Sequence, residues 1–128
     1  MKLLLDTHIV LWALLDPGRL RPEVAGRLMD PQVDVVVSAV VAWEVAIKQS
    51  LGKLTLPGPA ESWLVPAVEA VGFRWLPISA LDAVRVRTLP PVHQDPFDRL
   101  LIAQAMGGYT LVTADEVLRG YGVPVIWC

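Results

Sequence analysis

The stretch KLLLDTHIVLWALL, residues 2–15, contains a strand and a helix separated by one acidic residue. Lys2 to Leu5 is a short apolar run that ends at Asp6. His8 to Leu15 then has helical spacing until residues 16–18, Asp-Pro-Gly, stop it. This order predicts a chain that opens with a strand followed directly by a helix.

The same alternation continues to the C-terminus. We expect further strands at residues 33–37, 73–76, 110–113 and 123–127, and helices at 22–29, 39–51, 60–70, 79–86 and 96–106, with a last short helix before the final strand. Ser38 is a natural N-cap, and Pro66 predicts a kink or a break in its helix. Apolar, β-branched strands between helices predict a single α/β domain over residues 1–128, with a central, mostly parallel sheet covered by helices on both faces.

Composition excludes several classes of protein. The chain is 54% hydrophobic with five Trp, which excludes a disordered chain and leaves apolar surface for a partner or a homodimer. A net charge of -2 excludes a broad basic surface, so any contact with nucleic acid must be local. The only cysteine, Cys128, permits no internal disulfide and fits a reducing cytoplasm. No apolar run is long enough to cross a bilayer, so we expect a soluble protein.

Four carboxylates lie where negative charge is costly unless it binds something. Asp6 and Asp115 each follow a predicted strand, and ligands of parallel sheets bind outside the carboxyl ends of the strands. Taken alone, each is more simply an N-cap, which is worth about 1 kcal/mol.

Asp95 and Asp98 flank Pro96 at the start of a predicted helix. Asp95 has the position of an N-cap, and a capping box could account for both acids. Asp98 shares its helix face with Leu101 and Ile102, so its side chain is expected to point inward. We therefore interpret Asp98 as a ligand and Asp95 as a cap.

Glu44 lies in the middle of its helix, where it cannot be an N-cap. Residues at helical spacing from it, including Val40, Val41 and Ile47, are apolar, so the carboxylate lies on the buried stripe. The alternative partner is Lys48, although such a pair contributes only about 0.2–0.5 kcal/mol on an exposed helix. A divalent cation is the partner that the pattern favours.

Four converging carboxylates repel one another unless a hard cation such as Mg²⁺ or Mn²⁺ is bound. The reaction this predicts is phosphodiester hydrolysis, in which the metal activates water and neutralises charge on the phosphate. Whether one ion or two take part stays open.

Other polar residues near these acids have weaker assignments. Thr7 and Thr113 could hold the ligands by hydrogen bonds, with local capping as an equal alternative. Arg99, beside Asp98, is a possible phosphate contact. His8 and His93 lack zinc-site spacing, so packing or loop roles are the simpler interpretation.

Four segments together resemble the PIN-domain nucleases, especially VapC-type toxins of toxin–antitoxin pairs: LLDTH at 4–8, Trp43-Glu44, HQDPFDRLLIAQA at 93–105 and TAD at 113–115. The resemblance covers the whole chain. It implies a Mg²⁺- or Mn²⁺-dependent endoribonuclease that acts on RNA, in which Asp6, Glu44, Asp98 and Asp115 match the acidic quartet and Thr113 the hydroxyl position. It also implies a dimer and a cognate antitoxin. His8 departs from the small polar residue of many members, and Asp95 could bind metal in place of Asp98 or beside it.

Three other classes of protein share features with this chain. A receiver domain needs an Asp after its third strand, and residues 49–59 contain none. A haloacid-dehalogenase-type phosphatase needs a second Asp where this chain has His8. A catalytically silent PIN-like module that binds RNA or a protein partner remains, but such a module has no reason to keep four mutually repelling acids.

Overall fold

Five parallel strands form one sheet in the computed structural model, which describes residues 1–128. The strands are β1 (Lys2–Leu5), β2 (Asp34–Ser38), β3 (Arg74–Leu76), β4 (Thr110–Thr113) and β5 (Val125–Trp127). Their order is β3-β2-β1-β4-β5, and every neighbouring pair is parallel. The predicted fold class is therefore confirmed, and the sheet is wholly rather than mostly parallel.

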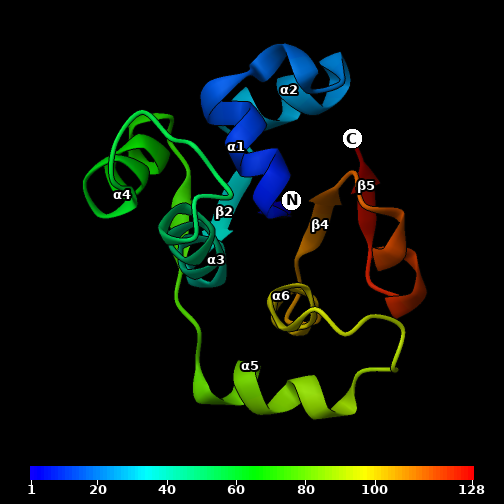
Figure 1. The fold of residues 1–128 in the computed structure, drawn as a ribbon. Coiled ribbons are helices and arrows are strands. Elements are labelled where there is room, and N and C mark those ends of the chain that lie inside the picture. Colours follow the sequence, from blue (N-terminus) through cyan, green and yellow to red (C-terminus); the bar gives the residue numbers. More distant parts are fainter.

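Helices cover both faces of this sheet (Figure 1). They are α1 (Thr7–Leu15), α2 (Pro22–Met29), α3 (Ala39–Ser50), α4 (Ala60–Ala70), α5 (Ala80–Arg85) and α6 (Pro96–Ala105), with the 3-10 turns η1 (Pro17–Arg19), η2 (Val86–Thr88) and η3 (Glu116–Tyr121). In Figure 1, α1 and α2 lie on one side of the strands and α5 and α6 on the other. None of the helices has both the length and the apolar character needed to span a membrane.

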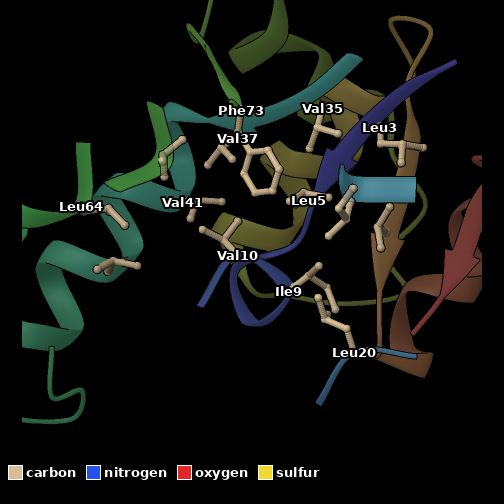
Figure 2. Packing of buried hydrophobic residues seen from close by; sticks show 14 of the residues in the cluster. Leu3, Leu5, Ile9, Val10, Leu20, Val35, Val37, Val41, Leu64 and Phe73 are labelled. Carbon is tan, nitrogen blue, oxygen red and sulfur yellow. The ribbon is translucent and has the colours of Figure 1, made fainter. Parts of the chain in front are cut away.

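The strands divide their side chains between two cores. In β1, Leu3 and Leu5 belong to one buried cluster, while Leu4 between them belongs to the other. In β2, Val36 likewise belongs to the second cluster, whereas the residues before and after it in the strand belong to the first. Figure 2 shows the first cluster, in which residues of the strands meet Ile9 and Val10 of α1, Val41 of α3 and Leu64 of α4. Burial on both faces explains why these strands are continuously apolar.

Two local predictions have different outcomes. Ser38 caps α3 as expected, because its side chain accepts a hydrogen bond from the N–H of Val40. Of the kink or break predicted at Pro66, the break is wrong, since α4 continues through this residue from Ala60 to Ala70. The kink stays a prediction. Leu64 and Val68 on either side are fully buried, and this packing offsets the loss of one backbone hydrogen bond.

The sheet positions a site at β1. The chain places β2 on one side of β1 and β4 on the other, so the strand order reverses there. Ligands of open parallel sheets bind at such a reversal, outside the carboxyl ends of the strands. Asp6 directly follows β1, and Ala114 and Asp115 follow β4.

Candidate active site

Asp6 is held at the end of β1 by residues of two elements. It is 5% exposed, and its Oδ1 accepts a 2.7 Å hydrogen bond from the N–H of Thr7. Its Oδ2 accepts a second 2.7 Å bond from the hydroxyl of Thr113, at the end of β4. The Thr113 hydroxyl in turn accepts from the N–H of Asp115 at 3.0 Å. One buried threonine therefore connects both acids that follow strands.

Glu44 is buried on α3, as the apolar stripe predicted, at 6% exposure. The hydroxyl of Thr7 donates to its Oε1 at 2.6 Å, and Nζ of Lys48 donates to its Oε2 at 2.5 Å. The pairing with Lys48, which the sequence placed second to a cation, is thus present in the structure. This hydrogen bond raises the pKa of the Lys48 ammonium.

Asp98 lies on α6 and is half-buried. Its Oδ2 is 2.8 Å from Nε2 of His93, and its side chain is only 16% exposed. Asp95 caps the same helix as predicted, because its Oδ1 accepts from the N–H groups of Phe97 and Asp98 at 2.9 and 3.2 Å. His93, Asp95 and Asp98 have ligand atoms within 4.8 Å of one another, a spacing that suits a metal ion.

Burial and mutual repulsion raise two carboxyl pKa values. The pKa of Asp98 rises from 3.8 to about 7, mainly because burial disfavours the charged form, with the charges of Asp6, Asp95 and Glu44 adding to it. Burial also raises the pKa of Asp6, against the hydrogen bonds from Thr113 and Thr7. These acids therefore act on one another electrostatically, which is the arrangement that a cation would relieve.

Asp115 is half-buried, and its Oδ1 accepts from the N–H of Val117 at 3.0 Å, so it also caps η3. Asp6 and Asp115 line the same pocket of about 390 Å³. The other residues around this pocket are His8, Trp12, Arg19 and Ala114. Asp115 is therefore both a cap of η3 and a neighbour of the pocket that Asp6 lines.

Arg99 makes contacts that its sequence position did not indicate. Its guanidinium donates to the carbonyl oxygens of Pro90 and His93 at 3.0 and 3.2 Å, and to those of Val86 and Leu89 at 3.1 and 3.5 Å. It thereby holds the loop that carries His93. A phosphate contact by Arg99 stays a prediction, and it would have to be made beside these bonds or in place of them.

His93 and Lys48 are the two residues at this centre that sequence reasoning assigned elsewhere or ranked low. The carbonyl of His93 accepts from Arg99 and from the hydroxyl of Tyr121, the latter at 3.2 Å, so its backbone is fixed by α6 and η3. The sequence holds one signal for the contact between His93 and Asp98. His93 stands five residues before this inward-pointing acid, and the helix cap Asp95 lies between them.

The residues present fit a divalent cation. Carboxylate oxygens with an imidazole nearby are donors that Mg²⁺ or Mn²⁺ accepts. Lys48 is paired with Glu44, and the charges of Asp6, Asp95 and Glu44 still add to the effect of burial in raising the pKa of Asp98.

Comparison with known proteins gives one family. The family model of the PIN domain matches residues 3–123, which is nearly the whole chain. No curated protein matches the chain.

Solved structures with the same fold accompany this match. A chain of VapBC2 from Rickettsia felis, determined bound to a DNA fragment from its promoter, has a TM-score of 0.74 at 16% identity, over 100% of this chain and 99% of that one. A chain of FitAcB from Neisseria gonorrhoeae has a TM-score of 0.62 at 23% identity, over 97% and 96%. A chain of FitAB bound to an IR36 DNA fragment scores 0.64 at 22% identity, over 97% and 93%. At these identities the likeness concerns the fold.

Proposed function

Because the chain belongs to the PIN-domain family, we propose that it is a Mg²⁺- or Mn²⁺-dependent endoribonuclease and the toxin of a toxin–antitoxin pair. PIN domains are generally nucleases, which hydrolyse phosphodiester bonds and typically use divalent metal ions. The cleavage of RNA, the identity of the ion and the role as a toxin are the steps that the proposal adds.

The observation that carries the proposal is the coupling of Asp98 to Asp6 and Glu44. Burial raises the pKa of Asp98 to about 7, and the negative charges of Asp6, Asp95 and Glu44 raise it further. Such a cluster costs stability in the free protein, and a bound cation would offset that cost. An ordinary N-cap does not require the inward position of Asp98 or the burial of Glu44.

We propose Asp6, Glu44, Asp98 and Asp115 as the residues that hold the ion, with His93 and Asp95 beside Asp98. Bound there, the ion would supply a water of lowered pKa and neutralise charge on the scissile phosphate.

Neighbouring residues orient these acids. Thr113 and Thr7 fix the carboxylates of Asp6 and Glu44 through their hydroxyls. The imidazole of His93 orients the carboxyl group of Asp98, because its Nε2 lies 2.8 Å from Oδ2. No serine or cysteine nucleophile is needed for this chemistry.

The solved structures with a similar fold support the proposed toxin role. The similar structures named VapBC2 and FitAB were determined bound to DNA, in one case a fragment of the promoter. We propose that this chain likewise pairs with a cognate antitoxin protein that covers apolar surface near Trp43, which is 52% exposed. We also propose that the chain forms a homodimer and acts in the cytoplasm.

Purified protein incubated with labelled RNA tests the activity. Cleavage is expected in Mg²⁺ or Mn²⁺, and none in excess EDTA. An Asp6→Asn, Asp98→Asn double variant, purified in the same way, serves as the control for a contaminating nuclease. Equal cleavage with and without EDTA, or by the control, would contradict the metal mechanism.

The ion pair between Lys48 and Glu44 favours one second candidate, a catalytically silent module that binds RNA or a protein partner. In that case Lys48 would be the permanent partner of Glu44. RNA binding without cleavage under any metal condition, together with melting temperatures unaffected by Mg²⁺ and Mn²⁺, would favour this alternative.

A further inference from the structure

The pocket beside the acidic centre has side chains of two kinds around it. Its lining includes two acids, Asp6 and Asp115, and three residues with aromatic or cationic side chains, His8, Trp12 and Arg19. Its volume of about 390 Å³ falls within the range of small-molecule sites, about 300–1,000 Å³. A molecule bound in it would lie directly against two of the proposed metal ligands.

Among the lining residues, an aromatic ring and a cation lie against each other. Cζ of Arg19 lies 4.6 Å from the centroid of the Trp12 ring, and the His8 ring lies 6.3 Å from that centroid at a tilt of 46°. Trp12 is half-buried and packs against the core, whereas His8 and Arg19 are exposed. Packing therefore fixes the indole, and the other two side chains extend from α1 and η1 toward solvent.

Arg19 has no carboxylate partner within 4.0 Å, although it borders a pocket that contains two acids. It makes no hydrogen bond through its guanidinium to other residues, unlike Arg99. The positive charge is thus free to meet an anion. In a chain of net charge -2, this local cation matters more than it would on a basic surface.

We propose that this pocket is a nucleotide subsite, in which one base of single-stranded RNA stacks against the Trp12–Arg19 pair and Arg19 contacts an adjacent phosphate. The inference rests on the proposed nuclease function and names how the substrate is held. Unpaired bases of RNA stack on aromatic rings and on guanidinium planes, while arginine recognises phosphate by charge-assisted hydrogen bonds. His8, which also lines the pocket, borders the base.

This arrangement also gives a role to the exposed imidazole of His8. An exposed imidazole next to a metal ligand is not required for the fold, since Ile9 and Val10 provide the buried side of α1. As part of the pocket wall, it extends the planar surface available to a base.

Binding of nucleoside 5′-monophosphates to the metal-free protein, measured by calorimetry, tests the subsite without any cleavage. Ribose 5-phosphate is the matched probe that lacks the base. The variants are Trp12→Leu, which keeps apolar packing, and Arg19→Gln, which changes only an exposed side chain. The control is Arg119→Gln, because Arg119 lies 4.3 Å over the ring of Trp127 in a similar pair that does not line the pocket.

We expect the parent to bind at least one nucleotide more tightly than ribose 5-phosphate, and Trp12→Leu and Arg19→Gln each to lose roughly tenfold in affinity. Arg119→Gln should bind as the parent does. In cleavage assays, the two pocket variants should raise KM more than they lower kcat. Thermal melts check that Trp12→Leu is folded, and Arg19→Gln decides the test if it is not.

The outcomes separate the subsite from the nuclease function. Nucleotide binding that depends on Trp12 and Arg19, without any cleavage of RNA, would keep the subsite and overturn the nuclease. Cleavage of RNA with an unchanged KM in Arg19→Gln would keep the nuclease function and overturn the subsite. Equal binding of ribose 5-phosphate and nucleotides, or no binding by the parent, would overturn the subsite.

Discussion

The hydroxyl of Thr113 donates a 2.7 Å hydrogen bond to the buried carboxylate of Asp6, although 107 residues separate them in the chain. The bond joins the ends of β1 and β4, the two strands between which the strand order reverses. The same hydroxyl accepts from the N–H of Asp115. This single side chain therefore sets the position of two acids of the candidate site.

Thr113→Val should destabilise the protein by about 1–3 kcal/mol, because it leaves a buried carboxylate oxygen and a backbone N–H without their partner. Thr113→Ser should cost less, since the hydroxyl is kept. Thr110→Val at the start of the same strand is the control, because Thr110 is only half-buried. Urea unfolding in EDTA measures the difference. Equal losses in Thr110→Val and Thr113→Val would show that the hydrogen bond is not the cause.

The raised pKa of Asp98 predicts how stability changes with pH. The folded value of about 7 exceeds the ordinary value of 3.8, so the native state binds more protons between these two pH values. The contribution of Asp98 to stability is then greatest below about pH 4 and is lost as pH rises toward 7. Its slope approaches at most about 1.4 kcal/mol per pH unit, the value for one proton.

Urea unfolding in EDTA across this pH range, for the parent and for Asp98→Asn, checks the prediction. The variant should lose this part of the slope and should be at least as stable as the parent at pH 7.5. Asp16→Asn, at an exposed position, controls for the loss of one negative charge. Parallel curves for the parent and Asp98→Asn would refute the assignment.

Lys48→Gln should destabilise the metal-free protein, because the buried carboxylate of Glu44 then keeps only the hydrogen bond from Thr7. The expected cost is about 1–2 kcal/mol, less than for a fully buried pair, since the Lys48 side chain is 40% exposed. Mg²⁺ or Mn²⁺ should then raise the melting temperature of the variant more than that of the parent, because the cation no longer competes with an ammonium group.

Lys53→Gln is the matched control for this pair, as Lys53 is exposed and makes no ion pair. It should leave both the melting temperature and the response to metal unchanged. An equal response of all three proteins to metal would mean that Lys48 and the ion do not share Glu44.

The sequence predicted the features that depend on local pattern. The alternation of apolar runs indicated the sheet, and the spacing around Glu44 indicated a buried carboxylate on α3, which the structure has. Ser38 and Asp95 were identified as caps because the preference for such residues at helix starts is local.

Features that depend on tertiary contacts were not predicted. The position of His93 is set by Arg99 and Tyr121, which hold its carbonyl from α6 and η3, and no local pattern reports such contacts. The persistence of α4 through Pro66 likewise depends on the burial of Leu64 and Val68. The pocket wall formed by Trp12 and Arg19 joins α1 to η1 across the turn between them, which spacing alone did not indicate.

Asp95 and Asp98 should be separable by conservative substitution. Asp98→Asn removes a charge that couples to Asp6 and Glu44, so RNA cleavage should be abolished. Asp95→Asn should keep most of the activity, because the amide oxygen can still accept from the N–H groups of Phe97 and Asp98.

Asp95→Ala completes this comparison, since it removes the cap as well as the charge. If Asp95 is only a cap, Asp95→Ala should lose about 0.5–2 kcal/mol of stability while Asp95→Asn loses little, and cleavage should follow the folded fraction in both. If both variants abolish cleavage at full folding, Asp95 binds the ion together with His93 and Asp98, whose ligand atoms lie within 4.8 Å of its own. Parallel urea unfolding and initial rates in Mn²⁺ distinguish the two cases, because a cap acts on stability and a ligand acts on the metal-dependent rate.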